Sequence, residues 1–297
     1  MKQEAIPFRG IIPPIVTPFR PDEELDEEGL RREVAFHLEA GVHGVSVSGS
    51  TGEGALLRDE ELRRVWTIAK EEVKGRVPFI PGVIRDSTRD AVASGLIARE
   101  LGVDGLMVAP VHYAKPTDDG MYEFYATLGR RTGLPIVIYN VVPINPLSPE
   151  LLCRLVEIKE VVGVKQSGGD IHALAEIIRL VGQEVAVMSA IDDLLLASFV
   201  IGAHGAFAGT CAMLPRQCLE LYQVVGKGDL DRARQLHTLM LPLVRATIYG
   251  VRNYPSALKE AINMMGRRVG RTRSPLTPLT PPEKDRLRAI LKTAGLV

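Results

Sequence analysis

The sequence predicts an α/β fold, a (β/α)8 TIM barrel followed by a C-terminal helical extension. Short apolar runs rich in β-branched residues alternate with longer amphipathic segments along the chain. Eight such runs fall within residues 1–225, which fits the strand number and the length of this barrel. The runs are apolar almost throughout, as expected for parallel strands that are covered on both faces.

The eight runs predict the strands, and the segments between them predict the helices. Strands are expected within residues 10–19, 44–50, 77–84, 105–110, 135–140, 163–167, 185–190 and 205–210. Helices are expected over residues 26–41, 59–75, 88–102 and 148–158, among others. Several of these segments begin at an acidic or hydroxyl residue and end at a glycine, as capped helices do. The alternative, a doubly wound open sheet, is disfavoured because no G-x-G-x-x-G fingerprint follows the first run.

Further helical patterns follow the eighth unit. They cover about residues 229–248, 255–265 and 282–294, and the last begins behind the proline-rich stretch 274–284. No repeat or linker separates them from the preceding part of the chain. The sequence therefore predicts a barrel over residues 1–225 and a C-terminal helical extension over residues 226–297.

Composition limits the classes of partner. The 297 residues carry 36 basic and 36 acidic side chains, so neither nucleic acid nor an anionic membrane surface is an expected partner. No apolar run approaches the ~20 residues of a spanning helix, and no signal peptide pattern begins the chain, which predicts a cytoplasmic location. The three cysteines, Cys153, Cys211 and Cys218, lack ligand spacing, so neither a disulfide framework nor a metal site is expected. A small molecule or another protein chain is the expected partner.

Lys165 ends the apolar run 161–165. Taken alone, a lysine in this place is expected to point into water, since lysine is costly to bury. In a barrel of this kind, however, the side chains at the carboxyl ends of the strands line the active site. The polar residues expected there, with one from the loop after strand four, are Ser50, Thr51, Tyr113, Tyr139, Asn140, Lys165, Asp192, Asp193 and Thr210. Asp192 and Asp193 are interpreted as carboxylates that favour the dipole of the helix they open.

A lysine among hydroxyl groups can form a Schiff base with a ketone. The amine must be neutral to attack, which requires its pKa to fall from ~10.4 by about 3 units, or about 4 kcal/mol. Desolvation by the apolar strand favours that change, and a nearby tyrosine can move the protons that the reaction releases and takes up. Lys165 and Tyr139 are therefore candidate catalytic residues.

Three stretches strengthen this interpretation. They are "GSTGE" (49–53), "YNVVP" (139–143) and "GVKQSGGD" (163–170), supported by "PPIVTPF" (13–19), "KPTDDGMY" (115–122) and "GAHGAFAGT" (202–210). In this order they resemble the signature stretches of the dihydrodipicolinate synthase and N-acetylneuraminate lyase family of pyruvate-dependent class I aldolases. The resemblance extends from the first predicted strand to the eighth, and the family's fold is also a barrel with a C-terminal helical extension.

The resemblance implies roles for individual residues. Lys165 matches the Schiff base lysine, and Tyr139 matches the tyrosine that relays protons beside it. Ser50 and Thr51 match the hydroxyl pair that holds the carboxylate of the 2-oxo acid. Phe207, in the last of the supporting stretches, is expected to contact the substrate.

Tyr113 matches a tyrosine that many members of the family insert into the active site of a neighbouring subunit. The resemblance therefore implies a homo-oligomer, either a dimer or a tetramer of two such dimers. It implies no metal and no organic cofactor.

The implied activity is that of a Schiff base-forming lyase or synthase of the dihydrodipicolinate synthase type, with pyruvate or a related 2-oxo acid and an aldehyde as substrates. Members that use aspartate semialdehyde typically carry an arginine where this chain has Ile144. An aldolase or dehydratase of 2-keto-3-deoxy sugar acids and an N-acetylneuraminate-type lyase therefore stay as alternatives. A non-catalytic sensor of 2-oxo acids is the alternative from another class. It is disfavoured because a binder needs neither a neutral amine at Lys165 nor a proton relay at Tyr139.

Overall fold

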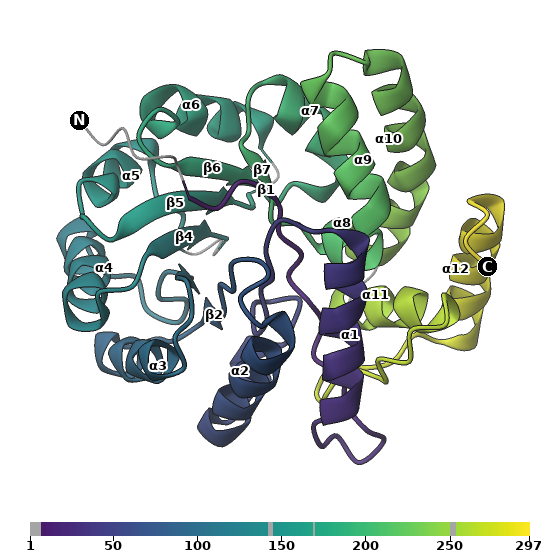
Figure 1. Cartoon of the computed structure of the whole chain (residues 1–297), viewed down its shortest axis with the longest axis horizontal. Helices are drawn as coiled ribbons and strands as arrows, with labels where there is room; N and C mark the ends of the chain where they lie inside the picture. The colour runs from purple at the N-terminus through teal and green to yellow at the C-terminus, as the bar shows by residue number, and fades with distance from the viewer. Residues whose placement is uncertain (1–6, 142–144, 169, 250–253) are drawn as a thin grey trace.

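A parallel sheet lies at the centre of the computed structural model, which describes residues 7–141, 145–168, 170–249 and 254–297 (Figure 1). Within these residues the sheet has seven strands in the order β1-β7-β6-β5-β4-β3-β2, and every neighbouring pair is parallel. The strands are β1 (Gly10–Ile11), β2 (Gly82–Val83), β3 (Leu106–Val108), β4 (Ile136–Asn140), β5 (Val161–Gln166), β6 (Ala186–Ser189) and β7 (Gly205–Ala206). The predicted alternation of strands and helices is confirmed.

The segment predicted as the second strand, residues 44–50, lies between β1 and β2 but pairs only locally. It forms two isolated parallel bridges, Pro14 with Ser46 and Val45 with Phe79. Prolines contribute to the interruption, because Pro13 and Pro78 occupy positions of the flanking segments from which an N–H would point toward the start of this segment, and proline has none to donate.

Helices surround the outside of the sheet (Figure 1). They are α1 (Glu27–Ala40), α2 (Asp59–Val73), α3 (Thr88–Glu100), α4 (Asp118–Thr132), α5 (Pro149–Val156), α6 (Ile171–Val181), α7 (Leu195–Val200), α8 (Gly209–Met213) and α9 (Pro215–Gly226), with short 3-10 turns η1 (Gly54–Leu56) and η2 (Asp192–Leu194). The predicted capping signals are present. In α1, for example, the Asp26 side chain accepts from the backbone N–H of Gly29 at 2.9 Å, and Gly41 ends the helix with φ 86°.

Two apolar clusters show that the sheet is curled. The larger cluster packs the outer face of the strands against the helices. The smaller one gathers side chains from alternate positions of several strands, among them Val137 and Tyr139 of β4, and Ala186 and Met188 of β6. Because alternate residues of a strand point to the same face, this second cluster lies on the inner face of the sheet.

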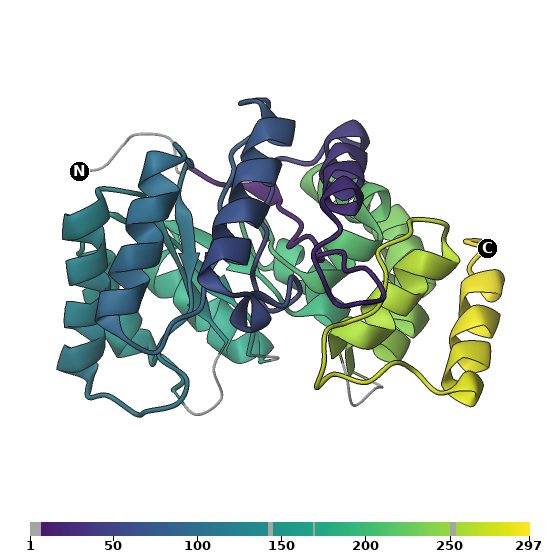
Figure 2. The same ribbon diagram turned by 90° about the horizontal axis from the view of Figure 1, so that it is seen from below.

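The C-terminal helices pack against α7, α8 and α9, outside the sheet. They are α10 (Leu230–Val244), the π-helical turn η3 (Arg245–Tyr249), α11 (Tyr254–Met264) and α12 (Pro281–Thr293). Figures 1 and 2 place α12 at the opposite end of the molecule from α4. Arg267, which follows α11, forms an ion pair with the buried Glu33 of α1 and donates to the carbonyl of Ala212 at 3.0 Å. In the described ranges, no helix has both the length and the apolar character needed to cross a membrane.

Candidate active site

Lys165 is buried at the end of β5, with 3% of its surface exposed. It is paired in register with Tyr139 of β4, so the two side chains extend to the same face of the sheet. The Lys165 Nζ atom lies 3.5 Å from the centroid of the Tyr139 ring and 5.0 Å from that of Phe207, and it donates to Met107 Sδ at 3.5 Å. The ammonium group therefore does not point into water, and it meets aromatic rings and a thioether instead.

This environment favours the neutral amine. Burial lowers the pKa of Lys165, while the neighbouring Tyr139, Asp192 and Cys211 act in the opposite direction. Desolvation is the largest of these effects, because a charged amine loses its hydration on an apolar strand. The direction is the one that nucleophilic attack on a carbonyl requires.

The ends of β4 and β5 are held together by polar contacts. The Asn140 amide donates to Gln166 Oε1 at 2.8 Å and to the carbonyl of Leu147 at 3.2 Å, and its own oxygen accepts from Leu147 N at 3.0 Å. The Tyr139 hydroxyl donates to Ser50 Oγ at 3.4 Å. Tyr139 therefore lies between the amine of Lys165 and the first hydroxyl of the predicted pair.

The loop 49–53 carries that pair and is held in an uncommon backbone conformation. Ser48 and Glu53 both have positive φ, 55° and 54°, which is rare outside glycine. The indole N–H of Trp66 donates to Ser48 Oγ at 2.8 Å, and Ser48 donates in turn to the carbonyl of Gly82 at 2.9 Å. A buried hydrogen bond from Thr17 Oγ1 to the Gly52 carbonyl, at 2.6 Å, fixes the loop from another side.

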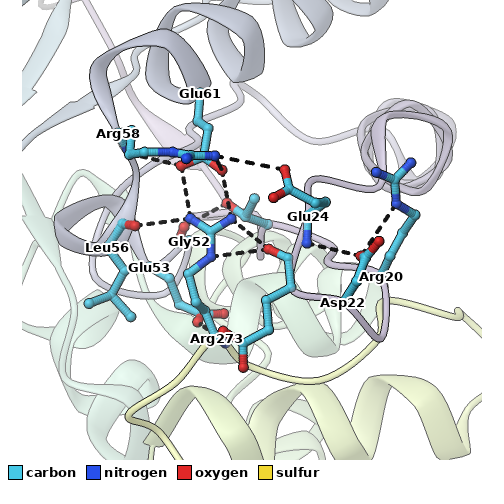
Figure 3. Close-up of polar contacts among 11 residues, drawn as sticks. Arg20, Asp22, Glu24, Gly52, Glu53, Leu56, Arg58, Glu61 and Arg273 are labelled. Carbon is cyan, nitrogen blue, oxygen red and sulfur yellow. Dashed lines mark hydrogen bonds and ion pairs between the residues drawn. The ribbon is translucent and has the colours of Figure 1, made fainter.

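Glu53, the last residue of the loop, is buried and paired with the C-terminal part of the chain. Its Oε1 lies 2.6 Å from Nζ of Lys259 in α11, and its Oε2 accepts from the backbone N–H of Arg273 at 2.9 Å. The Arg273 guanidinium donates to the Leu56 carbonyl at 3.0 Å and to both carboxylate oxygens of Glu61 at 2.6 and 2.9 Å (Figure 3). Although burial acts to raise it, the hydrogen bonds from Arg273 and from Arg58 lower the pKa of Glu61 to about 2.

Thr51 contacts another residue of α11, Tyr254, in addition to the contact between Glu53 and Lys259. Its Oγ1 lies 2.7 Å from the hydroxyl of Tyr254, which is 203 positions away in the sequence. Tyr254 and Lys259 were not predicted as site residues. No local signal distinguishes them from other residues of an amphipathic helix, and their distance in sequence from the loop conceals the contact.

Asp192 opens the turn η2 that leads into α7, as predicted, and it also lies close enough to Lys165 for their charges to interact. It is buried in η2, and its Oδ1 accepts from the backbone N–H and the hydroxyl of Thr210 at 2.6 and 2.7 Å. Burial raises the pKa of Asp192 to about 6, and the two hydrogen bonds from Thr210 and the charge of Lys165 oppose that rise. Thr210 belongs to α8 and not to the strand predicted to end there, because a helix begins at Gly209.

Tyr113 is the predicted site residue that the single chain does not bring to Lys165. Its side chain is 87% exposed. The loop that carries it is nevertheless fixed, since Asp86 Oδ1 accepts from the backbone N–H groups of His112 and Tyr113 at 2.7 and 3.0 Å, and the Asn145 amide donates to the carbonyls of Val111 and Ala114.

A cavity of about 520 Å³ opens next to Ser50. Its walls are largely apolar and come from both parts of the chain, and they include Ile84, Ala109, Val141, Pro255 and Leu276. Ile144, where the sequence departs from the aspartate semialdehyde-dependent enzymes, lies outside the described residues. Among the residues that the structure describes, no group of three or more His, Cys, Asp or Glu side chains could hold a metal ion.

Comparison with known proteins identifies the family. A model described as the dihydrodipicolinate synthetase family matches residues 7–294. The chain belongs to this family. The predicted relationship is thus confirmed, and with it the class I, pyruvate-dependent type of enzyme.

Relatives of this family match over almost the whole chain. A protein of Thermodesulfovibrio yellowstonii named 4-hydroxy-tetrahydrodipicolinate synthase is 34% identical over 98% of this chain and 99% of its own length. One of Methanopyrus kandleri with the same name is 35% identical over 98% and 97%.

Solved structures of the family agree with the fold. The chloride-inhibited dihydrodipicolinate synthase of Acinetobacter baumannii in complex with pyruvate has a TM-score of 0.93, with 31% identity over 99% of this chain and 100% of that one. A structure described as the first monomeric dihydrodipicolinate synthase variant has a TM-score of 0.93, with 33% identity over 98% of each chain.

Proposed function

We propose that this protein uses Lys165 to form an imine with pyruvate or a related 2-oxo acid, and that it joins the bound pyruvate to an aldehyde or releases it in the reverse reaction. Its relatives named 4-hydroxy-tetrahydrodipicolinate synthase support a reaction of that type. The observation that carries the proposal is the buried amine, held 3.5 Å from the centroid of the Tyr139 ring on an apolar strand that lowers the pKa of Lys165.

The chemistry follows from these groups. The neutral Lys165 amine attacks the ketone carbon of pyruvate, and loss of water from the carbinolamine leaves an iminium ion. The iminium accepts electrons from the adjacent C–H bond, the methyl group loses a proton, and the resulting enamine forms a C–C bond to the aldehyde carbon. Hydrolysis then releases the product and restores the amine. The Tyr139 hydroxyl is proposed to carry protons during formation and loss of the carbinolamine, a role worth ~10²–10⁴ in rate.

Three further residues are proposed to bind the 2-oxo acid. The hydroxyls of Ser50 and Thr51 lie on a loop with a fixed backbone and are suited to donate to the substrate carboxylate. Phe207 is buried, and its ring lies 5.0 Å from Lys165 Nζ, where it keeps water away from the amine. Holding both ends of pyruvate would make the attack effectively unimolecular.

The cavity beside Ser50 is proposed to receive the second substrate. Its described lining residues include neither arginine nor lysine, and most are apolar. Among these described residues a carboxylate would find no arginine or lysine, and the lack of such a partner costs roughly 1.5–3 kcal/mol, or about ten- to a hundredfold in affinity. These walls favour an aldehyde with an apolar substituent over aspartate semialdehyde, and they offer few partners for the hydroxyls of a sugar acid.

We further propose that residues 44–48 close the sheet as the eighth strand of a (β/α)8 barrel. Two bridges and the hydrogen bonds from Ile15 N to Ser46 O and from Gly82 N to Val47 O support this closure. The boundary between barrel and extension is proposed between residues 225 and 226, one residue before α9 ends at Gly226. The homo-oligomer and the cytoplasmic location stay predictions.

Reduction with borohydride tests the proposal. Pyruvate plus borohydride should label Lys165 covalently and inactivate the protein, while Lys165→Ala should take no label. Tyr139→Phe should still take the label, but more slowly. Label on a different lysine, or full activity in Lys165→Ala, would overturn the assignment.

A panel of aldehydes then identifies the second substrate. Efficient turnover of aspartate semialdehyde, with a kcat/KM of ~10⁴ M⁻¹s⁻¹ or more, would refute the preference for an apolar aldehyde.

A further inference from the structure

We infer that Tyr254 is a positioning residue for the substrate carboxylate, acting through the hydroxyl of Thr51. The inference rests on the proposed function, in which Thr51 binds the 2-oxo acid. Its starting point is the 2.7 Å contact between Tyr254 OH and Thr51 Oγ1, both of them on buried or half-buried side chains. The contact joins the C-terminal helices to the loop that carries the predicted carboxylate site.

The direction of this hydrogen bond decides what Thr51 can do. A phenol is the better donor of the two groups and an aliphatic hydroxyl is the better acceptor. Burial and the nearby charge of Asp192 raise the pKa of Tyr254, so the phenol keeps its proton at neutral pH. When Tyr254 donates to Thr51 Oγ1, the proton of Thr51 is free to point elsewhere and to donate to a bound carboxylate. The hydrogen bond from Tyr254 to Thr51 and the one from Thr51 to the carboxylate then run in the same direction, and each strengthens the other.

The position of the Tyr254 ring is fixed by its neighbours. A Cβ atom at Gly209, the first residue of α8, would lie 2.3 Å from Tyr254 OH and 3.2 Å from its Cζ. The ring therefore occupies the space that glycine leaves open. Tyr254 therefore contacts the start of α8 on one side and the loop 49–53 on the other.

A second contact joins the same two elements. Glu53 follows Thr51 in the loop, Lys259 follows Tyr254 in α11, and these two charged side chains form a buried ion pair at 2.6 Å. Two contacts between one loop and one helix prevent the loop from turning about either of them. The Tyr254 hydroxyl is therefore held at a constant place relative to Thr51, as a positioning role requires.

Removal of the Tyr254 hydroxyl should weaken pyruvate binding without removing the reacting groups. In Tyr254→Phe we expect the pyruvate concentration for half-maximal borohydride labelling of Lys165 to rise about three- to tenfold, the range for loss of one hydrogen bond. The labelling rate at saturating pyruvate should change by less than about twofold, since Lys165 and Tyr139 are intact.

A double-mutant cycle separates positioning from general loosening of the structure. In a Thr51→Val background the hydroxyl that Tyr254 orients is absent, so Tyr254→Phe should leave the half-maximal concentration unchanged. The matched control is Tyr222→Phe, which removes a tyrosine hydroxyl that donates to the carbonyl of His204 at 3.1 Å. This control should leave the pyruvate dependence of labelling as in the wild type.

The outcomes are distinct. The positioning role is overturned if Tyr254→Phe leaves the pyruvate concentration for half-maximal labelling unchanged. It is also overturned if Tyr254→Phe raises that concentration by the same factor in the Thr51→Val background as in the wild type. Either result leaves the proposed function intact. A wild-type chain that takes no label overturns the proposed function, and the positioning role with it.

Discussion

At the scale of single residues, Asp192 is a group whose charge is unfavourable in the folded protein. Its carboxyl is buried, and burial raises its pKa from the usual 3.8 to about 6, although Thr210 donates to it twice and Lys165 lies near it. At neutral pH the group therefore carries a charge at a cost to stability. The same charge acts on Lys165, where it opposes the fall in pKa that burial causes.

The first prediction concerns the pH dependence of this cost. Because the folded protein holds the Asp192 proton more tightly than the unfolded chain does, the contribution of Asp192 to stability falls as pH rises from about 4 to about 6 and is constant above that range. The full change is about 3 kcal/mol. Asp192→Asn keeps an oxygen that can accept from Thr210 and has no such dependence. The free energy of unfolding of Asp192→Asn minus that of the wild type, measured with urea, should therefore be larger at pH 7 than at pH 4. A difference that does not vary with pH would contradict the raised pKa.

Local sequence could identify some site residues and not others. Lys165, Tyr139, Ser50 and Thr51 each end or follow a predicted strand, and a parallel sheet brings such ends to one edge. Tyr254 meets Thr51 because α11 packs beside α8, and no pattern within the helix predicts that contact. The position of Asp192 before a helix could be predicted, but its burial depends on the packing of η2 against α7 and against α10, which comes from a later part of the chain.

At the scale of elements, α11 and the loop 49–53 depend on one buried ion pair. Glu53 and Lys259 are each 1% exposed at the side chain. Burial lowers the pKa of Lys259, and the charge of Glu53 opposes this. Such a pair contributes little net stability against apolar replacements, but the loss of one partner leaves a buried charge without compensation.

The second prediction follows from this asymmetry. Lys259→Met should lower the free energy of unfolding by about 3–5 kcal/mol, because the Glu53 carboxylate stays buried without its cation. Glu53→Gln in addition should recover most of that loss, since the amide can still accept from Arg273 N and carries no charge. Urea unfolding of the two single variants and the double variant gives the coupling energy. Additive losses would mean that the two charges do not depend on each other.

The strands and helices were largely predictable, and the exceptions have physical causes. Helices such as α1, α2 and α3 lie within a few residues of their expected ranges, because their caps and apolar periodicity are local properties. Residues 44–50 were expected as a strand, and the prolines of the neighbouring segments help to reduce them to bridges. The start of α8 at Gly209 was not expected, since the sequence before Thr210 is as apolar as a strand.

At the scale of the whole molecule, the loop of Tyr113 is the feature that a single chain does not explain. A large aromatic side chain is 87% exposed, yet Asp86 and Asn145 fix the backbone on both sides of it. Ordering a loop costs conformational entropy, and a fixed exposed tyrosine suits a surface that a second copy covers. Because one solved relative is described as a monomeric variant, the assembly of this chain must be tested directly.

The last prediction concerns a site shared between two chains. If Tyr113 enters the site of its neighbour, Tyr113→Phe and Lys165→Ala should each be nearly inactive alone, and a mixture that exchanges subunits should regain activity. In a mixed dimer the chain with Lys165 receives Tyr113 from the other chain, so up to about a quarter of all sites are intact in an equal mixture. The matched control replaces the Lys165→Ala chain with one that carries both substitutions, which can form mixed dimers but no intact site. Native mass spectrometry of differently tagged chains shows whether mixed dimers form. Mixed dimers without activity above this control would mean that each chain builds its site alone, and that the fixed loop of Tyr113 serves another contact.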